Sequence, residues 1–142
     1  MVNPLLASPE SIRRELSAGM LPPNRMPISD SVEEYVWSHT PGGHSAMFEV
    51  PPYLRRPLDL VGSRKYQGIV VVAPAQCLKT FTMVECVLAE NIKNIHADML
   101  VVQTRKDMAR DFSMSRLARL LRWSKGLESL QVGDNVFDKQ FR

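Results

Sequence analysis

The stretch of residues 68–90 constrains the fold of this chain more than any other. It opens with the β-branched run Ile-Val-Val-Val at residues 69–72, which has the length and composition of a fully buried strand. A short loop follows and ends in Lys79-Thr80. Beyond it, apolar residues recur at helical spacing without Gly or Pro, at Met83, Val84, Val87 and Leu88. The sequence therefore predicts a strand, a tight loop and a helix that begins near the lysine.

This order of elements is typical of a loop that binds phosphate. Backbone N–H groups at a helix N-terminus point at the anion, and the helix dipole adds about half a positive charge there. A Lys adds a full charge, and a following hydroxyl can bind Mg²⁺. The usual pattern G-x-x-x-x-G-K-[ST] has glycines where this chain has Ala73 and Leu78. The alternative is an ordinary strand-to-helix turn with an exposed lysine.

Size and composition permit one soluble domain. The chain has 142 residues, of which 44% are hydrophobic, and a net charge of +3 that permits an anionic partner without requiring one. Its two cysteines do not suggest a disulfide framework, and neither they nor the three histidines have metal-ligand spacing. No apolar run is long enough to cross a bilayer, and residues 1–6 do not resemble a signal peptide. We expect an intracellular chain.

Further helices are predicted before the loop. Ser8 and Pro9 suit a helix over residues 8–18, and a proline-rich linker follows at residues 20–27. A short helix should begin near Ser29 or Asp30, with Asp30 and Glu33 at capping-box spacing. Pro51 and Pro52 could open another helix, which the proline at position 57 would shorten or kink.

The helix that starts at Pro52 carries an aromatic-basic group that could flank a nucleotide. Tyr53 could stack on a base, and Arg55 or Arg56 could contact the base or a phosphate. The alternative is that Tyr53 packs on a sheet edge and both arginines face water.

After the loop helix the chain repeats the pattern. Residues 97–103 predict a second buried strand, and residues 104–123 predict a helix with Thr104 and Asp107 at capping-box spacing. This order of predicted elements, strand, helix, strand and helix, favours a parallel sheet with right-handed crossovers. Arg116, Arg119 and Arg122 form a row that could line a nucleic-acid channel or simply face water. Residues 133–135 predict a turn, and residues 136–141 an incipient strand.

Taken together, these segments resemble the large terminase subunits of tailed phages, of the lambda-like GpA type. The resemblance extends in order over residues 32–142 and is carried by residues 34–37, 52–56, 75–80, 100–103, 108–113, 116–122 and 134–142. It implies an α/β P-loop NTPase fold of the RecA-like (ASCE) kind, with a parallel sheet behind a helical N-terminal lead. We expect residues 1–50 to form the lead and linker and residues 51–142 to form part of the ATPase domain.

The resemblance also implies a function: ATP-driven translocation of viral double-stranded DNA. Lys79 and Thr80 would be catalytic, with Lys79 on the β- and γ-phosphates of ATP and Thr80 on Mg²⁺. The nucleotide-binding residues would be Ala75, Gln76, Cys77, Leu78, Lys79, Thr80, Tyr53, Arg55 and Arg56, and the weak DNA contacts would be Arg116, Arg119 and Arg122. Implied partners are the small terminase subunit, the portal or procapsid and further copies of the chain, in the host cytoplasm without a membrane.

Two departures from the family pattern bear on activity. The family keeps Gly before the lysine, where this chain has Leu78, and Gln after the tyrosine, where it has Leu54. The apolar strand ending in paired acids, which holds Mg²⁺ and positions water, has no counterpart before Arg142. We therefore expect a fragment that binds nucleotide and does not hydrolyse it at a useful rate alone.

Two alternatives remain open. The chain could be part of another P-loop ATPase, such as a helicase. It could also be a non-catalytic module in which the basic helix over residues 105–122 binds nucleic acid or a partner and the loop is vestigial.

Overall fold

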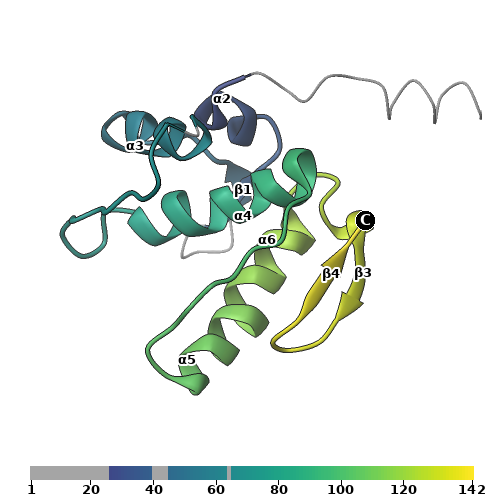
Figure 1. Cartoon of the computed structure of the whole chain (residues 1–142). Coiled ribbons are helices and arrows are strands. Elements are labelled where there is room, and N and C mark those ends of the chain that lie inside the picture. Colours follow the sequence, from purple (N-terminus) through teal and green to yellow (C-terminus); the bar gives the residue numbers. More distant parts are fainter. Residues whose placement is uncertain (1–25, 40–44, 64) are drawn as a thin grey trace, which may run out of the picture.

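A computed structural model describes residues 26–39, 45–63 and 65–142 (Figure 1). The predicted helix over residues 8–18 and most of the linker after it lie outside the described residues. None of the helices in the described part is both long enough and apolar enough to pass through a lipid bilayer.

The first described element is helix α2 (Ile28–Glu33), which matches the short helix predicted near Ser29. Its predicted capping box was wrong, because Pro27 is the N-cap and no side chain caps the helix. The Glu33 carboxylate instead accepts a hydrogen bond from the backbone N–H of Val50 at 2.8 Å. Glu33 therefore ties α2 to the chain that enters the next helix.

Two short strands and a helix follow. Strand β1 (Trp37–His39) pairs antiparallel with β2 (Ser45–Met47), with Trp37 opposite Met47. Helix α3 (Pro52–Gly62) has Pro51 as its N-cap, as the two prolines predicted. It continues through its internal proline for another turn, so the proline does not end the helix.

The helix after the predicted phosphate loop, here called the loop helix, is a continuous helical run over residues 79–95. It comprises η1 (Phe81–Glu85), α4 (Cys86–Glu90) and η2 (Asn91–Ile95), and His96 ends it in the left-handed conformation with φ 56°. The basic helix covers residues 106–123 as α5 (Lys106–Asp111), η3 (Phe112–Leu117) and α6 (Ala118–Trp123). This confirms the helix predicted after the second strand, although Arg105 rather than Thr104 is the N-cap and no side chain caps it.

The two predicted β-branched strands are not paired in the described residues. Residues 68–74 and 97–103 carry no strand assignment, and both sheets of the described part are two-stranded and antiparallel. Val72 and Leu100 leave 93% and 88% of their surfaces exposed, so the predicted burial of these two segments was wrong for the described residues. The predicted parallel sheet is therefore not seen here and stays a prediction.

The chain ends in a hairpin. A short 3-10 turn, η4 (Glu128–Leu130), leads into β3 (Gln131–Asp134), which pairs antiparallel with β4 (Lys139–Phe141). The turn predicted at residues 133–135 was wrong by a few positions, because Gly133 and Asp134 still belong to β3.

The core joins the N-terminal elements to the two long helices, with the loop helix crossing the molecule near α2 and α3 and the basic helix extending away from it (Figure 1). Its buried side chains come from α2, α3, the loop helix, α6 and the segments that flank them: Ile28, Val32, Tyr35, Val36, Phe48, Val50, Leu54, Leu58, Cys86, Ala89, Ile92, Leu120, Leu121 and Leu127. The boundary that the sequence suggested at residue 50 is not tested by this packing and stays a prediction.

Candidate nucleotide-binding site

The phosphate loop, here residues 74–80, joins a segment without helix or strand assignment to the loop helix. Residues 75–78 form turns, and Lys79 and Thr80 are the first helical residues after them. The Lys79 ammonium and the Thr80 hydroxyl therefore come from the first turn of a long helix. That is the end of a helix at which unpaired backbone N–H groups and the helix dipole favour an anion.

The backbone φ angle changes sign from one residue to the next in this loop. Gln76 and Leu78 have φ values of +59° and +60°, whereas Cys77 between them is not in that region. Alternation of this kind turns successive N–H groups toward one side and makes a concave anion site. A left-handed conformation costs about 1–2 kcal/mol for a residue with a Cβ. Leu78 therefore adopts a conformation that favours glycine, and its side chain leaves 51% of its surface exposed.

Lys79 folds back across the loop. Its Nζ donates a hydrogen bond to the Pro74 carbonyl at 2.7 Å, and the Cys77 thiol donates to the same oxygen at 3.1 Å. A neutral carbonyl is a weaker partner for an ammonium than a phosphate oxygen, because the phosphate adds the attraction of a full opposite charge. The lysine is therefore held over the loop by a contact that an anion can replace.

Tyr53 is the residue of the aromatic-basic group that reaches the loop. Its hydroxyl donates to the Cys77 carbonyl at 3.1 Å, while the side chain leaves 61% of its surface exposed. The ring is thus accessible at the edge of the loop, where the sequence predicted a base.

The two arginines of the same group differ from each other. Arg55 forms ion pairs with Glu33 at 2.6 Å and with Asp30 at 3.2 Å, so its guanidinium links α3 to α2. Arg56 is exposed and has no hydrogen-bond or ion-pair partner among the described residues. The link through Arg55 was not foreseen, although two acids on the preceding predicted helix were a signal for it.

The row of arginines on the basic helix is not uniform. Arg116 pairs with Glu85 of the loop helix at 3.3 Å and remains half-exposed. The Arg119 Nε donates to the Ser115 carbonyl at 2.8 Å. Arg122 is exposed and lacks a polar partner in the part of the chain that the structure describes. Arg116 therefore connects two helices, while Arg122 is free to meet an anion.

Glu85 is nearly fully buried opposite Arg116. Burial raises the pKa of its carboxyl group, and the nearby Arg116 guanidinium opposes that rise. The pair therefore depends on Arg116 to keep a buried carboxylate ionised.

The loop offers one candidate ligand for Mg²⁺. The Thr80 hydroxyl has no hydrogen-bond partner among the described residues, and it lies in the first helical turn after the loop. No group of three or more His, Cys, Asp or Glu side chains in the described ranges could hold a metal. Thr80 would therefore be the loop's one side-chain ligand to a Mg²⁺ ion that accompanies a bound phosphate.

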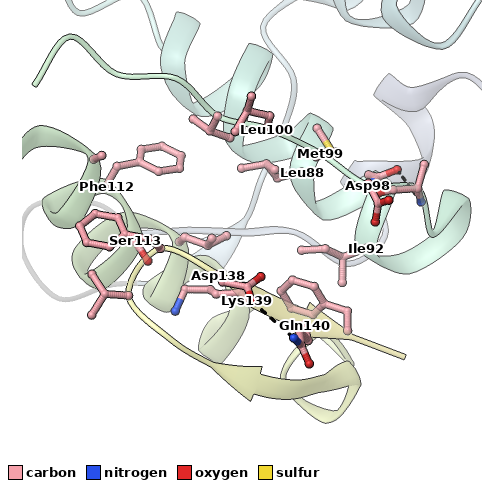
Figure 2. A pocket seen from close by; sticks show the side chains of 18 of the residues that line it. Leu88, Ile92, Asp98, Met99, Leu100, Phe112, Ser113, Asp138, Lys139 and Gln140 are labelled. Carbon is pink, nitrogen blue, oxygen red and sulfur yellow. Dashed lines mark hydrogen bonds between the residues drawn. The ribbon is translucent and has the colours of Figure 1, made fainter. Parts of the chain in front are cut away.

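A separate groove of about 670 Å³ lies between the loop helix, the extended segment after it, the basic helix and the hairpin (Figure 2). Leu88, Ile92 and Phe112 contribute apolar walls from the two helices, and Lys139 and Gln140 line it from β4. None of its lining residues belongs to the phosphate loop. The groove is therefore distinct from the candidate nucleotide site.

Comparison with known proteins identifies one family. No curated protein and no solved structure was found to match the chain. The family model described as the phage terminase large subunit gpA, ATPase domain, matches residues 38–142. The matched region contains Tyr53, the phosphate loop and the basic helix. The chain therefore belongs to the ATPase domain family of the phage terminase large subunit gpA.

Proposed function

We propose that this chain binds ATP with Mg²⁺ through the phosphate loop, as the nucleotide-binding part of a DNA-packaging motor. The observation that carries the proposal is the alternating backbone at Gln76 and Leu78 directly before a helix that begins with Lys79. Such a loop concentrates N–H groups and a full positive charge at one point. Membership in an ATPase domain family makes a nucleotide the ligand to expect there.

In this proposal each loop residue has a defined role. The amides of residues 76–79 cradle the phosphates, while the Lys79 ammonium leaves the Pro74 carbonyl for the β- and γ-phosphates. The Thr80 hydroxyl supplies one ligand to Mg²⁺, which neutralises phosphate charge when it is bound. Tyr53 stacks its exposed ring on the base, and Arg56 is free to contact the base or a phosphate. Arg55 would have to give up its ion pairs with α2 to do the same.

The wider role follows from the family rather than from the site. We propose that the chain works in ATP-driven translocation of viral double-stranded DNA, with the small terminase subunit, the portal or procapsid and further copies of itself, in the host cytoplasm. Hydrolysis also requires a carboxylate on Mg²⁺ and a group that positions water. None of the chain's segments reads as an apolar strand that ends in paired acids. We therefore expect ATP binding without useful hydrolysis by these 142 residues.

Titration of a fluorescent ATP analogue in the presence of Mg²⁺ tests the proposal. Lys79→Ala should weaken binding at least about tenfold, because a hydrogen bond between charged groups typically contributes 1.5–3 kcal/mol. Lys65→Ala is the matched control, since Lys65 is an exposed lysine outside the phosphate loop. Equal affinity of the Lys79→Ala variant and the parent chain would refute the assignment.

A second candidate function rests on the free guanidinium of Arg122. The chain could bind nucleic acid through its basic helix without using a nucleotide. DNA binding that falls steeply with salt and is unaffected by ATP would favour this module. Arg122→Ala should then weaken DNA binding more than Arg116→Ala, because the Glu85 carboxylate already neutralises Arg116.

A further inference from the structure

We infer that Tyr53 is a positioning residue for the phosphate loop, through its hydroxyl rather than through its ring. The inference rests on the proposed nucleotide site and adds a contact that stabilises the conformation of the loop. The Tyr53 hydroxyl donates a hydrogen bond to the Cys77 carbonyl at 3.1 Å. This contact joins α3 to a loop that is 24 residues further along the chain.

The bond fixes the orientation of one peptide group. The described chain contains no cis peptide bond, so the Cys77 carbonyl and the Leu78 N–H point in opposite directions across a planar unit. When Tyr53 holds the carbonyl on its own side, the Leu78 N–H is directed to the other side of the loop. Tyr53 therefore sets the direction of an amide that precedes Lys79.

The loop needs this support because its conformation is unfavourable for its residues. Gln76 and Leu78, on either side of Cys77, both have a positive φ although neither is glycine. Such conformations persist only where surrounding contacts enforce them. Two other loop contacts, from the Cys77 thiol and the Lys79 ammonium, converge on the Pro74 carbonyl within the loop itself. Among the described residues, the Tyr53 hydroxyl provides the side-chain hydrogen bond that reaches the loop from another element.

Cys77 reports on the loop directly, since it is half-buried and takes part in two of these contacts. Cys86, the chain's other cysteine, is fully buried in the core and serves as an internal reference. The rate at which N-ethylmaleimide modifies Cys77 in the absence of nucleotide therefore measures how readily the loop opens. Mass spectrometry of the two cysteine peptides separates loop opening from global unfolding.

The test compares Tyr53→Phe with Tyr66→Phe in the full 142-residue chain. Tyr53 and Tyr66 are similarly exposed, at 61% and 60%, and Tyr66 has no polar partner among the described residues. Tyr53→Phe keeps the ring and removes the hydroxyl, so we expect Cys77 modification to accelerate about 2- to 10-fold, the range of one neutral hydrogen bond. We expect no change in the Cys86 rate or in the urea midpoint. Tyr66→Phe should leave both cysteine rates unchanged.

Affinity for MgATP separates this inference from the proposed function. If the inference holds, Tyr53→Phe weakens MgATP binding by a factor similar to the change in the Cys77 rate. An unchanged or slower Cys77 rate in Tyr53→Phe overturns the inference even when the parent chain binds ATP. If Tyr53→Phe accelerates Cys77 and the parent chain does not bind MgATP, the loop support stands and the proposed function fails. An accelerated rate with unaltered MgATP affinity overturns the role of the hydroxyl in phosphate binding.

Discussion

Two regions at opposite ends of the loop helix are held in different ways. Near its C-terminal end, Ser31, Tyr35, Glu90 and Asn94 form a buried polar junction between α2 and the helix. At its N-terminal end, the phosphate loop is held by a few exposed hydrogen bonds and contains two residues with positive φ. The comparison indicates a rigid platform that carries a loop with little stability of its own.

The polar junction is fully paired. The Glu90 carboxylate accepts hydrogen bonds from the Ser31 hydroxyl at 2.7 Å, the Tyr35 hydroxyl at 2.9 Å and the Asn94 amide at 2.9 Å. Burial, followed by the charge of Glu90, raises the pKa of Tyr35, so the phenol remains a donor at any physiological pH. The Lys93 ammonium lies 3.6 Å from the centre of the Tyr35 ring. A satisfied buried network of this kind favours one arrangement of α2 on the loop helix.

The largest expected effect comes from breaking the polar junction. Glu90→Ala leaves the buried Ser31 and Tyr35 hydroxyls without their acceptor and removes one of the two acceptors of the half-buried Asn94 amide. We expect a loss of about 3–5 kcal/mol in the free energy of unfolding. Urea denaturation followed by circular dichroism measures it, with the exposed Glu49→Ala as the control. Glu90→Gln keeps an acceptor and should lose less. If Glu90→Ala unfolds at the same urea concentration as the parent chain, the polar junction does not stabilise the packing of α2 on the loop helix.

Replacing either partner of the ion pair between Glu85 and Arg116 should lower the stability of the fold by a different amount. Arg116→Ala leaves a buried carboxylate without its ion pair and should cost about 1–3 kcal/mol. Glu85→Gln leaves Arg116 in water, because half of that side chain is already exposed, and should cost less than about 1 kcal/mol. Urea midpoints of the two single variants decide the order. Equal losses would show that Arg116 does more than offset the buried charge.

The same pair gives a pH dependence with a definite sign. Burial raises the pKa of Glu85 in the folded chain, so the folded state holds that proton more tightly than the unfolded state does. The resulting stabilisation is complete below the unfolded pKa of about 4.3 and is lost as the pH rises through the folded pKa. The parent chain should therefore gain stability relative to Glu85→Gln when the pH falls from 7 to 5. If the parent chain instead loses stability relative to Glu85→Gln when the pH falls from 7 to 5, the result would contradict the buried position of this carboxyl group.

The smallest expected effect lies in the phosphate loop. Leu78→Gly removes the cost of a left-handed residue but increases the entropy of the unfolded chain, so we expect a net stabilisation of less than about 1 kcal/mol. Ala75→Gly is the matched control, because Ala75 does not have a positive φ, and it should destabilise by a few tenths of a kcal/mol or more. Thermal unfolding measures both. A clear loss of stability in Leu78→Gly would show that the leucine packs in the loop instead of merely tolerating its backbone.

Local patterns in the sequence predicted the helices well. The paired prolines predicted the start of α3, and the apolar spacing after Lys79 predicted the loop helix. The lysine-threonine pair also indicated which turn carries the candidate site. These features depend on neighbouring residues, and for that reason they can be read from a single segment.

Features that depend on distant partners were not predictable in the same way. The predicted strands at residues 69–72 and 97–103 carry no strand assignment, because a strand requires a hydrogen-bonding neighbour that local sequence does not identify. The capping box at Asp30 and Glu33 failed because both acids pair with Arg55, 22 or more residues away. The positive φ of Leu78 was equally hidden, since leucine rarely adopts that conformation unless tertiary contacts enforce it.

The most direct test of the account is the rate at which N-ethylmaleimide modifies Cys77 with and without MgATP. Cys77 lies in the loop that we propose to surround the phosphates, and buried Cys86 provides the reference in the same sample. We predict that saturating MgATP slows Cys77 modification at least about tenfold in the parent chain, and that the same MgATP concentration protects Cys77 much less in Lys79→Ala. A Cys77 rate in the parent chain that is the same with and without MgATP would contradict phosphate binding by this loop.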